Sequence, residues 1–158
     1  MMRILGIDPG YERLGIAVVE KENGIDALIF SECYKTPADL SFPERLHRVG
    51  TEVAAIIKKH KPEHLAIENL FFNTNQKTAM HIAEVRGAIL YIAMENGLGV
   101  FQYTPPQIKA AVAGSGRGSK KDVTAMLGHL IRIDKEIRHD DEYDAIAVAV
   151  THSAIHRI

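Results

Sequence analysis

Four carboxylates in this sequence have positions that suggest a chemical role. Two of them follow apolar runs, where burying a charge costs free energy, and the other two lie close together in sequence. Asp8 and Glu68 each follow a short apolar run, so each is predicted to lie at the end of a buried strand. Asp141 and Asp144 are three residues apart, which places them on one face of a predicted helix. A carboxylate at the end of a buried strand needs a compensating partner. For Asp8, this partner is predicted to be Arg13, a backbone amide or a metal ion.

Together the acids indicate metal-dependent chemistry. If the four side chains converge, they repel one another and are stable only around divalent cations, of which magnesium suits oxygen ligands best. Two such ions can clamp the attacking and leaving oxygens of a phosphodiester. Simpler explanations exist for single acids: Glu68 can be a solvated acid or a helix cap, and acids in a first helical turn favour the helix dipole. They do not explain Asp144, which begins the apolar face of its helix.

A glycine-rich loop with lysines around it is the clearest basic feature. The loop over residues 114–118 holds three glycines, so its backbone can approach a ligand closely. Ser119 is predicted to cap the next helix, and a helix N-terminus favours phosphate. A solvated loop is the simpler alternative, but the combination favours contact with phosphate. The basic residues of this cluster are Lys109, Arg117, Lys120 and Lys121.

An aromatic pair, Phe71 and Phe72, precedes a run of polar residues. At strand or helix spacing the two side chains cannot both enter a core, so one is predicted to point outward from a loop. Beside an acidic site, such a side chain could stack on a nucleic-acid base. The alternative is a hydrophobic contact that supports the start of the next helix.

These residues are positioned by a predicted succession of strands and helices. Turn signals separate the first three strands, which are predicted to form an antiparallel meander. The fourth strand repeats the pattern of the first, with an acid at its end. If the two are parallel neighbours, Asp8 and Glu68 emerge at one sheet edge, where α/β proteins bind ligands. The predicted strands cover residues 4–8, 14–19, 25–34, 64–68 and 99–103, and the predicted helices begin near residues 42, 78, 107, 120 and 140.

The predicted helix over residues 78–96 is apolar most of the way round. A helix that is apolar on two faces is buried on both. In a small domain, one face can pack on the sheet and the other on a second subunit. The sequence therefore predicts a homodimer with this helix at its interface.

Composition limits the class of protein. The 158 residues suit one domain over residues 1–158, and 46% hydrophobic residues are normal for a protein with a core. At a net charge of -1, binding to nucleic acid would depend on a local basic patch. The single cysteine, Cys33, excludes an internal disulfide and a cysteine-based zinc site. No apolar run has the length of a membrane span and no secretory leader opens the chain, so we expect a cytoplasmic protein.

Three motifs together resemble the bacterial RuvC family of Holliday junction resolvases, and they match it in order and spacing over nearly the whole chain. The motifs are Ile7-Asp8-Pro9-Gly10 with Gly15, then Ala66-Ile67-Glu68, then Asp141-x-x-Asp144-Ala145 followed by Ala147, Val150, Thr151 and His152. The resemblance implies an α/β, ribonuclease H-like fold: a five-stranded mixed sheet with helices on both faces. It also implies a magnesium-dependent homodimer that makes paired, symmetric nicks across four-way DNA junctions in recombination and repair, with the branch-migration proteins RuvA and RuvB as partners.

The resemblance also assigns roles to residues. Asp8, Glu68, Asp141 and Asp144 match the catalytic acids that hold the metals, two magnesium ions per subunit for which manganese can substitute. Phe71 matches an aromatic residue near the crossover of the junction. Lys109 and Lys120 match basic residues near the scissile phosphate, where Lys120 would offset charge in the transition state. The implied hydrolysis leaves 5′-phosphate and 3′-hydroxyl ends.

Some assignments stay open in the sequence. Asp140 adds an acid beside Asp141, but the spacing to Asp144 favours Asp141 as the ligand. His139 could tune or join the site. His152 lies roughly 12 Å beyond Asp144 along a helix, too far to bind the same ion.

Alternative functions are also open. Gly6–Gly10 resembles the first phosphate loop of sugar kinases and actin-like ATPases, although those phosphotransferases need two such domains. A non-catalytic junction-binding module would leave the four acids unexplained. Another ribonuclease H-like nuclease, acting on RNA or on RNA–DNA hybrids, is the third alternative.

Overall fold

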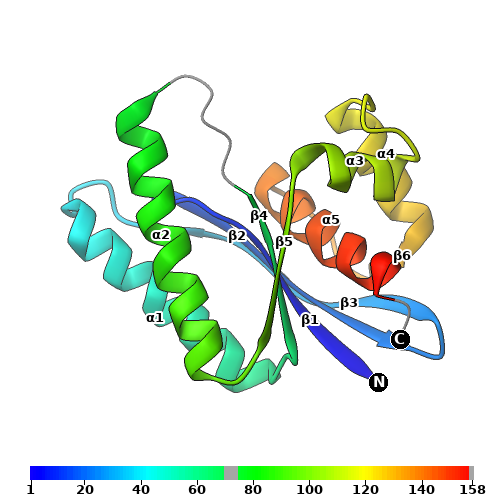
Figure 1. Cartoon of the computed structure of the whole chain (residues 1–158), viewed down its shortest axis with the longest axis horizontal. Helices are drawn as coiled ribbons and strands as arrows, with labels where there is room; N and C mark the ends of the chain where they lie inside the picture. The colour runs from blue at the N-terminus through cyan, green and yellow to red at the C-terminus, as the bar shows by residue number, and fades with distance from the viewer. Residues whose placement is uncertain (70–74, 157–158) are drawn as a thin grey trace.

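The computed structural model describes residues 1–69 and 75–156, and within these ranges the chain forms a six-stranded sheet with five helices (Figure 1). The strands are β1 (Met2–Asp8), β2 (Arg13–Glu22), β3 (Ile25–Lys35), β4 (His64–Glu68), β5 (Gly99–Tyr103) and β6 (Ile131–Arg132). The helices are α1 (Phe42–His60), α2 (Gln76–Glu95), α3 (Pro105–Ala113), α4 (Lys120–Leu130) and α5 (Asp140–Ile155). Phe71 lies outside the described residues.

The first strand, β1, lies in the interior of the sheet, whose order is β5-β4-β1-β2-β3-β6. It is antiparallel to β2, which is antiparallel to β3, so the predicted meander is confirmed. On its other side β1 is parallel to β4. The carboxyl ends of β1 and β4 therefore meet at the same edge of the sheet, as the sequence predicted.

Helices cover both faces of the sheet, which explains why the strands lack a polar alternation. Figure 1 shows α1 and α2 on one side and α3, α4 and α5 on the other. Within β1, Ile4 packs in the core beneath α5, while Leu5 and Ile7 pack in the core beneath α1 and α2. Among the described residues, none of the helices combines the length and the apolar character that crossing a membrane requires.

The prediction of five strands was wrong by one short strand. Ile131 and Arg132 form β6, which pairs in parallel with Asp26 and Ala27 of β3. A strand of two residues has no periodicity that a sequence pattern can reveal, because even one alternation needs more positions. Its pairing depends on where α4 ends.

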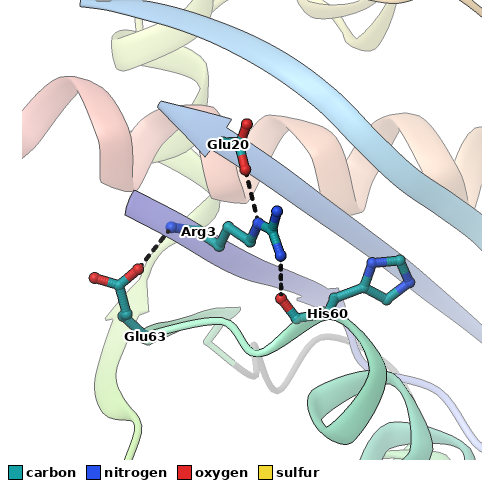
Figure 2. A network of polar contacts seen from close by, with 4 residues as sticks. All are labelled: Arg3, Glu20, His60 and Glu63. Carbon is teal, nitrogen blue, oxygen red and sulfur yellow. Dashed lines mark hydrogen bonds and ion pairs between the residues drawn. The ribbon is translucent and has the colours of Figure 1, made fainter. Parts of the chain in front are cut away.

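The register between β1 and β4 is fixed at their amino ends by Arg3 (Figure 2). The Arg3 backbone N–H donates to Glu63 Oε1 at 3.2 Å, and the Glu63 backbone N–H donates to the Arg3 carbonyl at 2.9 Å. The guanidinium donates to Glu20 of β2 and to the carbonyl of His60 at the end of α1. These bonds fix Ile4 opposite His64, and the ladder then aligns the far ends of the two strands.

The helix α5 approaches β1 and β2 closely because glycines face it. A methyl group placed on Gly6 would lie 2.2 Å from the carbonyl oxygen of Ala145, and one placed on Gly15 would lie 2.1 Å from that of Asp141. Only glycine leaves room for the helix at these two positions. The first turn of α5 is thereby held against the sheet edge where β1 ends.

Capping boxes begin the helices that flank this edge. Ser41 and Glu44 start α1, and Ser119, the predicted cap, starts α4 together with Asp122. In α4, the backbone N–H of Asp122 donates to Ser119 Oγ at 3.1 Å, and the backbone N–H of Ser119 donates to Asp122 Oδ2 at 2.9 Å. Such reciprocal bonds fix the first turn of a helix. They fix Lys120 as the first residue of α4.

At the opposite end of α5, His152 is fully buried between polar partners. Its Nδ1 lies 2.7 Å from the Tyr103 hydroxyl and its Nε2 lies 2.8 Å from His64 Nδ1. A neutral imidazole can donate at one nitrogen and accept at the other, so it satisfies both contacts. Burial, together with His156 and His64, lowers the pKa of His152 to about 4.

Acid is therefore expected to destabilise the fold through His152. The folded pKa is depressed below the unfolded value of 6.5, so this contribution is present above pH 6.5 and is lost as the pH falls towards 4. The full loss is about 3 kcal/mol. Urea unfolding at several pH values between 7 and 4.5 measures the slope. His152→Gln should flatten it, whereas the exposed His129→Gln should leave it unchanged; an equal slope in both variants would contradict the assignment.

Candidate active site

The carboxyl ends of β1 and β4 and the first turns of α5 bring the predicted acids together. Asp8 is paired with Gly15 of β2, and Gly15 in turn faces Asp141. Glu68 and Asp144 line one cleft of about 230 Å³. The four acids, spread over more than a hundred residues of sequence, thus occupy one edge of the sheet.

The electrostatics of this edge show the mutual repulsion expected of converging acids. Burial, followed by the charges of Asp144, Glu68 and Asp141, raises the pKa of Asp8 from 3.8 to about 8, against the opposing charge of Lys120. Burial and the charge of Asp144 also raise the pKa of Glu68. Burial raises the pKa of Asp144 as well, although Lys120 counteracts it. Without a further cation, the site holds a proton that ordinary carboxylates would release.

Two cationic side chains neutralise part of the acidic charge. Lys120 Nζ lies 3.0 Å from Asp144 Oδ2. Burial alone would lower the pKa of Lys120, but its hydrogen bond and attraction to Asp144 outweigh this and raise it. Arg13 Nη2 lies 2.6 Å from Asp141 Oδ2. The side chains of Lys120 and Arg13 are both half or more exposed. Their charges therefore do not cancel the effect of burial on Asp8 and Glu68.

Arg13 is not the partner of Asp8 that the sequence allowed; it binds Asp141 instead. The register explains this difference. Because Gly15 is opposite Asp8, Arg13 stands beyond the end of β1, where the first turn of α5 lies. Cys33 of β3 also reaches this carboxylate, with Sγ 3.5 Å from Asp141 Oδ2.

The donor set fits a hard divalent cation better than any other ion, because all four side chains offer carboxylate oxygens. Among the described residues, however, no three His, Cys, Asp or Glu side chains meet as ready-made ligands of one ion. The pairs with Lys120 and Arg13 account for part of this, since each ties an oxygen of Asp144 or Asp141 to a cation. The buried, repelling acids are what a divalent cation would stabilise.

The basic residues predicted around the site divide into two groups. Lys109 of α3 and Lys120 of α4 line the same cleft as Glu68 and Asp144. Its remaining walls are apolar and come from Pro105, Ile108, Val123 and Ala147. Arg117 and Lys121 are exposed and are not among the described residues that line the cleft.

Residues beside Asp141 differ in their surroundings. Asp140 is exposed as the first residue of α5, whereas Asp141 is partly buried and bound to Arg13. His139 precedes the helix and makes no side-chain capping bond. The geometry therefore favours Asp141 over Asp140 at the sheet edge, as the spacing did.

Arg86 of α2 makes a contact near the site that the sequence did not predict. Its guanidinium binds the end of β4, where Nε donates to the Glu68 carbonyl at 3.1 Å. An arginine on an otherwise mixed helix carries no local signal of such a partner, because the two residues are distant in sequence and meet only in the fold.

The sheet is mixed, has helices on both faces, and carries acids at the ends of β1 and β4 and at the start of α5. These features define a ribonuclease H-like nuclease. The family model for crossover junction endodeoxyribonuclease RuvC matches residues 4–152. The chain therefore belongs to the RuvC family, and the resemblance seen in the three motifs is confirmed.

Relatives and solved structures agree with this assignment. The chain is 41% identical over 152 residues to crossover junction endodeoxyribonuclease RuvC of Desulfitobacterium hafniense, covering 96% of this chain and 92% of the relative. It is 42% identical over 151 residues to that of Caldanaerobacter subterraneus, with 96% and 92% covered. The structure of T. thermophilus RuvC in complex with a Holliday junction substrate is similar, with a TM-score of 0.92 and 32% identity, covering 99% of this chain and 96% of that one.

Proposed function

We propose that this chain is an endonuclease that resolves four-way DNA junctions by paired, symmetric nicks and leaves 5′-phosphate and 3′-hydroxyl ends. The observation that carries the proposal is the convergence of Asp8, Glu68 and Asp144 beside Lys109 and Lys120. Acids alone would repel DNA, but acids with lysines along one cleft suit a phosphodiester held next to a metal. Membership of the RuvC family supports the junction as substrate.

Asp8, Glu68, Asp141 and Asp144 would hold the divalent cations, two magnesium ions per subunit, with manganese as a substitute. When bound, such ions activate water and stabilise the leaving oxygen. The protein contributes a buried, oxygen-rich edge in which Asp8 already has a pKa of about 8. Loss of that proton and loosening of the Lys120 and Arg13 pairs would free carboxylate oxygens for the metal.

Lys120 would compensate the charge that gathers on the phosphate during cleavage. Lys120→Ala is therefore expected to lower the single-turnover cleavage rate by about 10²-fold. Junction affinity in the absence of metal should fall much less, because the other basic residues remain. Lys58→Ala, in the exposed last turn of α1, is the matched control and should cleave normally. An unchanged rate for Lys120→Ala would remove this residue from the site.

The remaining basic and aromatic residues would bind DNA around the cleft. Lys109 lines the cleft itself, whereas Arg117 and Lys121 extend the basic surface away from it. Phosphate contacts of this kind bring affinity that falls as the salt concentration rises. Phe71 would stack on a base near the crossover.

The functional unit would be a homodimer joined through α2, each subunit using residues 1–158 as one nuclease domain. Three large apolar side chains of α2 are strongly exposed: Met80 is 63% exposed, Tyr91 67% and Met94 64%. These side chains lie near an apolar groove between α1 and α2. Together they offer a surface that a second copy can cover. Two subunits related by a two-fold axis would also explain paired, symmetric nicks.

Analytical ultracentrifugation is expected to give the mass of two chains at micromolar concentration. Tyr91→Glu should shift the protein towards the monomer, because it puts a charge into the proposed apolar interface. Ile25→Glu is the matched control, since Ile25 on β3 is also 67% exposed but lies away from α2. A monomeric mass for the unmodified protein would refute the dimer.

Cleavage of a synthetic four-way junction, with and without magnesium, tests the proposed function. We expect magnesium-dependent nicks at symmetric positions and little cleavage of a linear duplex. Preferred cleavage of an RNA–DNA hybrid would instead favour a different ribonuclease H-like nuclease, and binding without cleavage would overturn the catalytic proposal. The same junction, assembled with RuvA and RuvB, tests these proteins as partners in the cytoplasm.

A further inference from the structure

Arg86 connects the middle of α2 to the ends of two strands. Its Nε donates to the Glu68 carbonyl at 3.1 Å, and its Nη2 donates to Asn69 Oδ1 at 3.2 Å and to Gln102 Oε1. The three acceptors belong to the last residue of β4, the residue that follows it, and β5. One planar guanidinium thus joins α2 to both strands.

All three acceptors of Arg86 are neutral oxygens. Burial lowers the pKa of Arg86, and none of the ion pairs among the described residues includes it. An arginine that is desolvated without a carboxylate partner incurs a cost that only well-directed hydrogen bonds offset. The fork geometry of the guanidinium suits this task, because it directs several donors at once.

The position of these bonds matters because Glu68 ends β4. Beyond the strand ladder, the chain is fixed there by the Asn69 backbone N–H, which donates to the Tyr103 carbonyl at 2.8 Å, and by Arg86. The direction of the Glu68 side chain depends on the backbone at this last residue. A loss of the Arg86 bonds would let the strand end rotate, and the Glu68 carboxylate with it.

We propose that Arg86 is a positioning residue that sets the Glu68 carboxylate for metal binding by fixing the carboxyl end of β4. The proposal rests on the proposed function in one respect, that Glu68 is a metal ligand. Arg86 would act through the Glu68 backbone carbonyl and not as a metal ligand itself. It also ties the site to α2, the helix proposed to join the two subunits.

Arg86→Lys tests this role with little change in charge or volume. A lysine ammonium is a single point that cannot span the three acceptors. The magnesium concentration for half-maximal cleavage should rise about 10-fold, as for other groups that orient a metal ligand. Junction affinity without metal and the melting temperature should stay close to those of the unmodified protein. Excess magnesium should restore most of the cleavage rate.

Two further variants separate positioning from general damage. Gln102→Ala removes one acceptor, and combined with Arg86→Lys it should add little, because both changes break the same network. Arg132→Lys is the matched control, since Arg132 is exposed and pairs only with the exposed Asp134. An unchanged magnesium requirement in Arg86→Lys would overturn the proposal.

A direct measure of metal binding keeps this test independent of cleavage. Free manganese can be quantified by electron paramagnetic resonance in titrations of the unmodified protein, Arg86→Lys and Arg132→Lys. Weaker manganese binding only in Arg86→Lys supports the positioning role, even if the protein does not cleave junctions. Equal binding in all three proteins would overturn the role of Arg86, even if junction cleavage is observed.

Discussion

Asp8→Asn is expected to abolish magnesium-dependent junction cleavage while leaving junction binding intact. The charges of the other three acids all act on Asp8, so its loss would remove a ligand that the proposed metal site cannot replace from its surroundings. A loss of about 4 kcal/mol of transition-state stabilisation corresponds to a rate about 10³-fold lower. Single-turnover cleavage and a gel-shift assay in calcium measure the two effects. A normal cleavage rate would show that the metal assignment is wrong.

The same variant is expected to stabilise the protein when metal is removed. The folded pKa of Asp8 is raised from 3.8 to about 8, so the folded state favours the protonated acid. Stability from this group is therefore present at low pH and lost as the pH rises through about 8. In a chelator at pH 9, Asp8→Asn should be more stable than the unmodified protein, by up to about 6 kcal/mol. Urea unfolding at pH 6 should show a smaller difference.

Added magnesium provides the control for that measurement. A ligand that binds only the folded protein raises its stability. Magnesium should therefore stabilise the unmodified protein more than Asp8→Asn. Equal stabilisation of both proteins would place the metal elsewhere.

Gly15→Ala is expected to damage both the fold and the site. The added methyl group would lie 2.1 Å from the Asp141 carbonyl oxygen and 3.2 Å from the Asp8 Cβ, so α5 must move away from the sheet. Overpacking of this kind costs about 1–3 kcal/mol of folding stability. A shift of about 1 Å in the acids can cost about 10²-fold in rate. Thermal unfolding and single-turnover cleavage measure these losses.

Gly128→Ala is the matched control for this change. Gly128 lies in α4 and has nothing within 4 Å of the added group, so alanine should be tolerated and should stabilise the helix slightly. Gly6→Ala should resemble Gly15→Ala in stability, because its methyl group would lie 2.2 Å from the Ala145 carbonyl. Full cleavage by Gly15→Ala would contradict the close packing of α5.

Much of the fold could be predicted from the sequence because its signals are local. The apolar runs that end in Asp8 and Glu68 predicted two strand ends, and Ser119 predicted the start of α4. Long-range contacts could not be predicted in this way. The pairing of Arg13 with Asp141, the Arg86 bonds and the two-residue strand β6 all depend on which segments meet after folding. The glycines gave no sign that α5 would require them.

The elements that line the two sides of the cleft differ in how many buried residues they contain. The acidic side chains of the cleft, Glu68 and Asp144, come from β4 and α5, and α5 alone buries ten residues. The lysine wall belongs to α3 and α4, in each of which two residues are buried. Regions with few buried contacts open at a lower free energy than the molecule as a whole. Heating is thus expected to detach Lys109 and Lys120 before the sheet unfolds, so the proposed cleavage activity would be lost while the spectroscopic signature of the sheet persists.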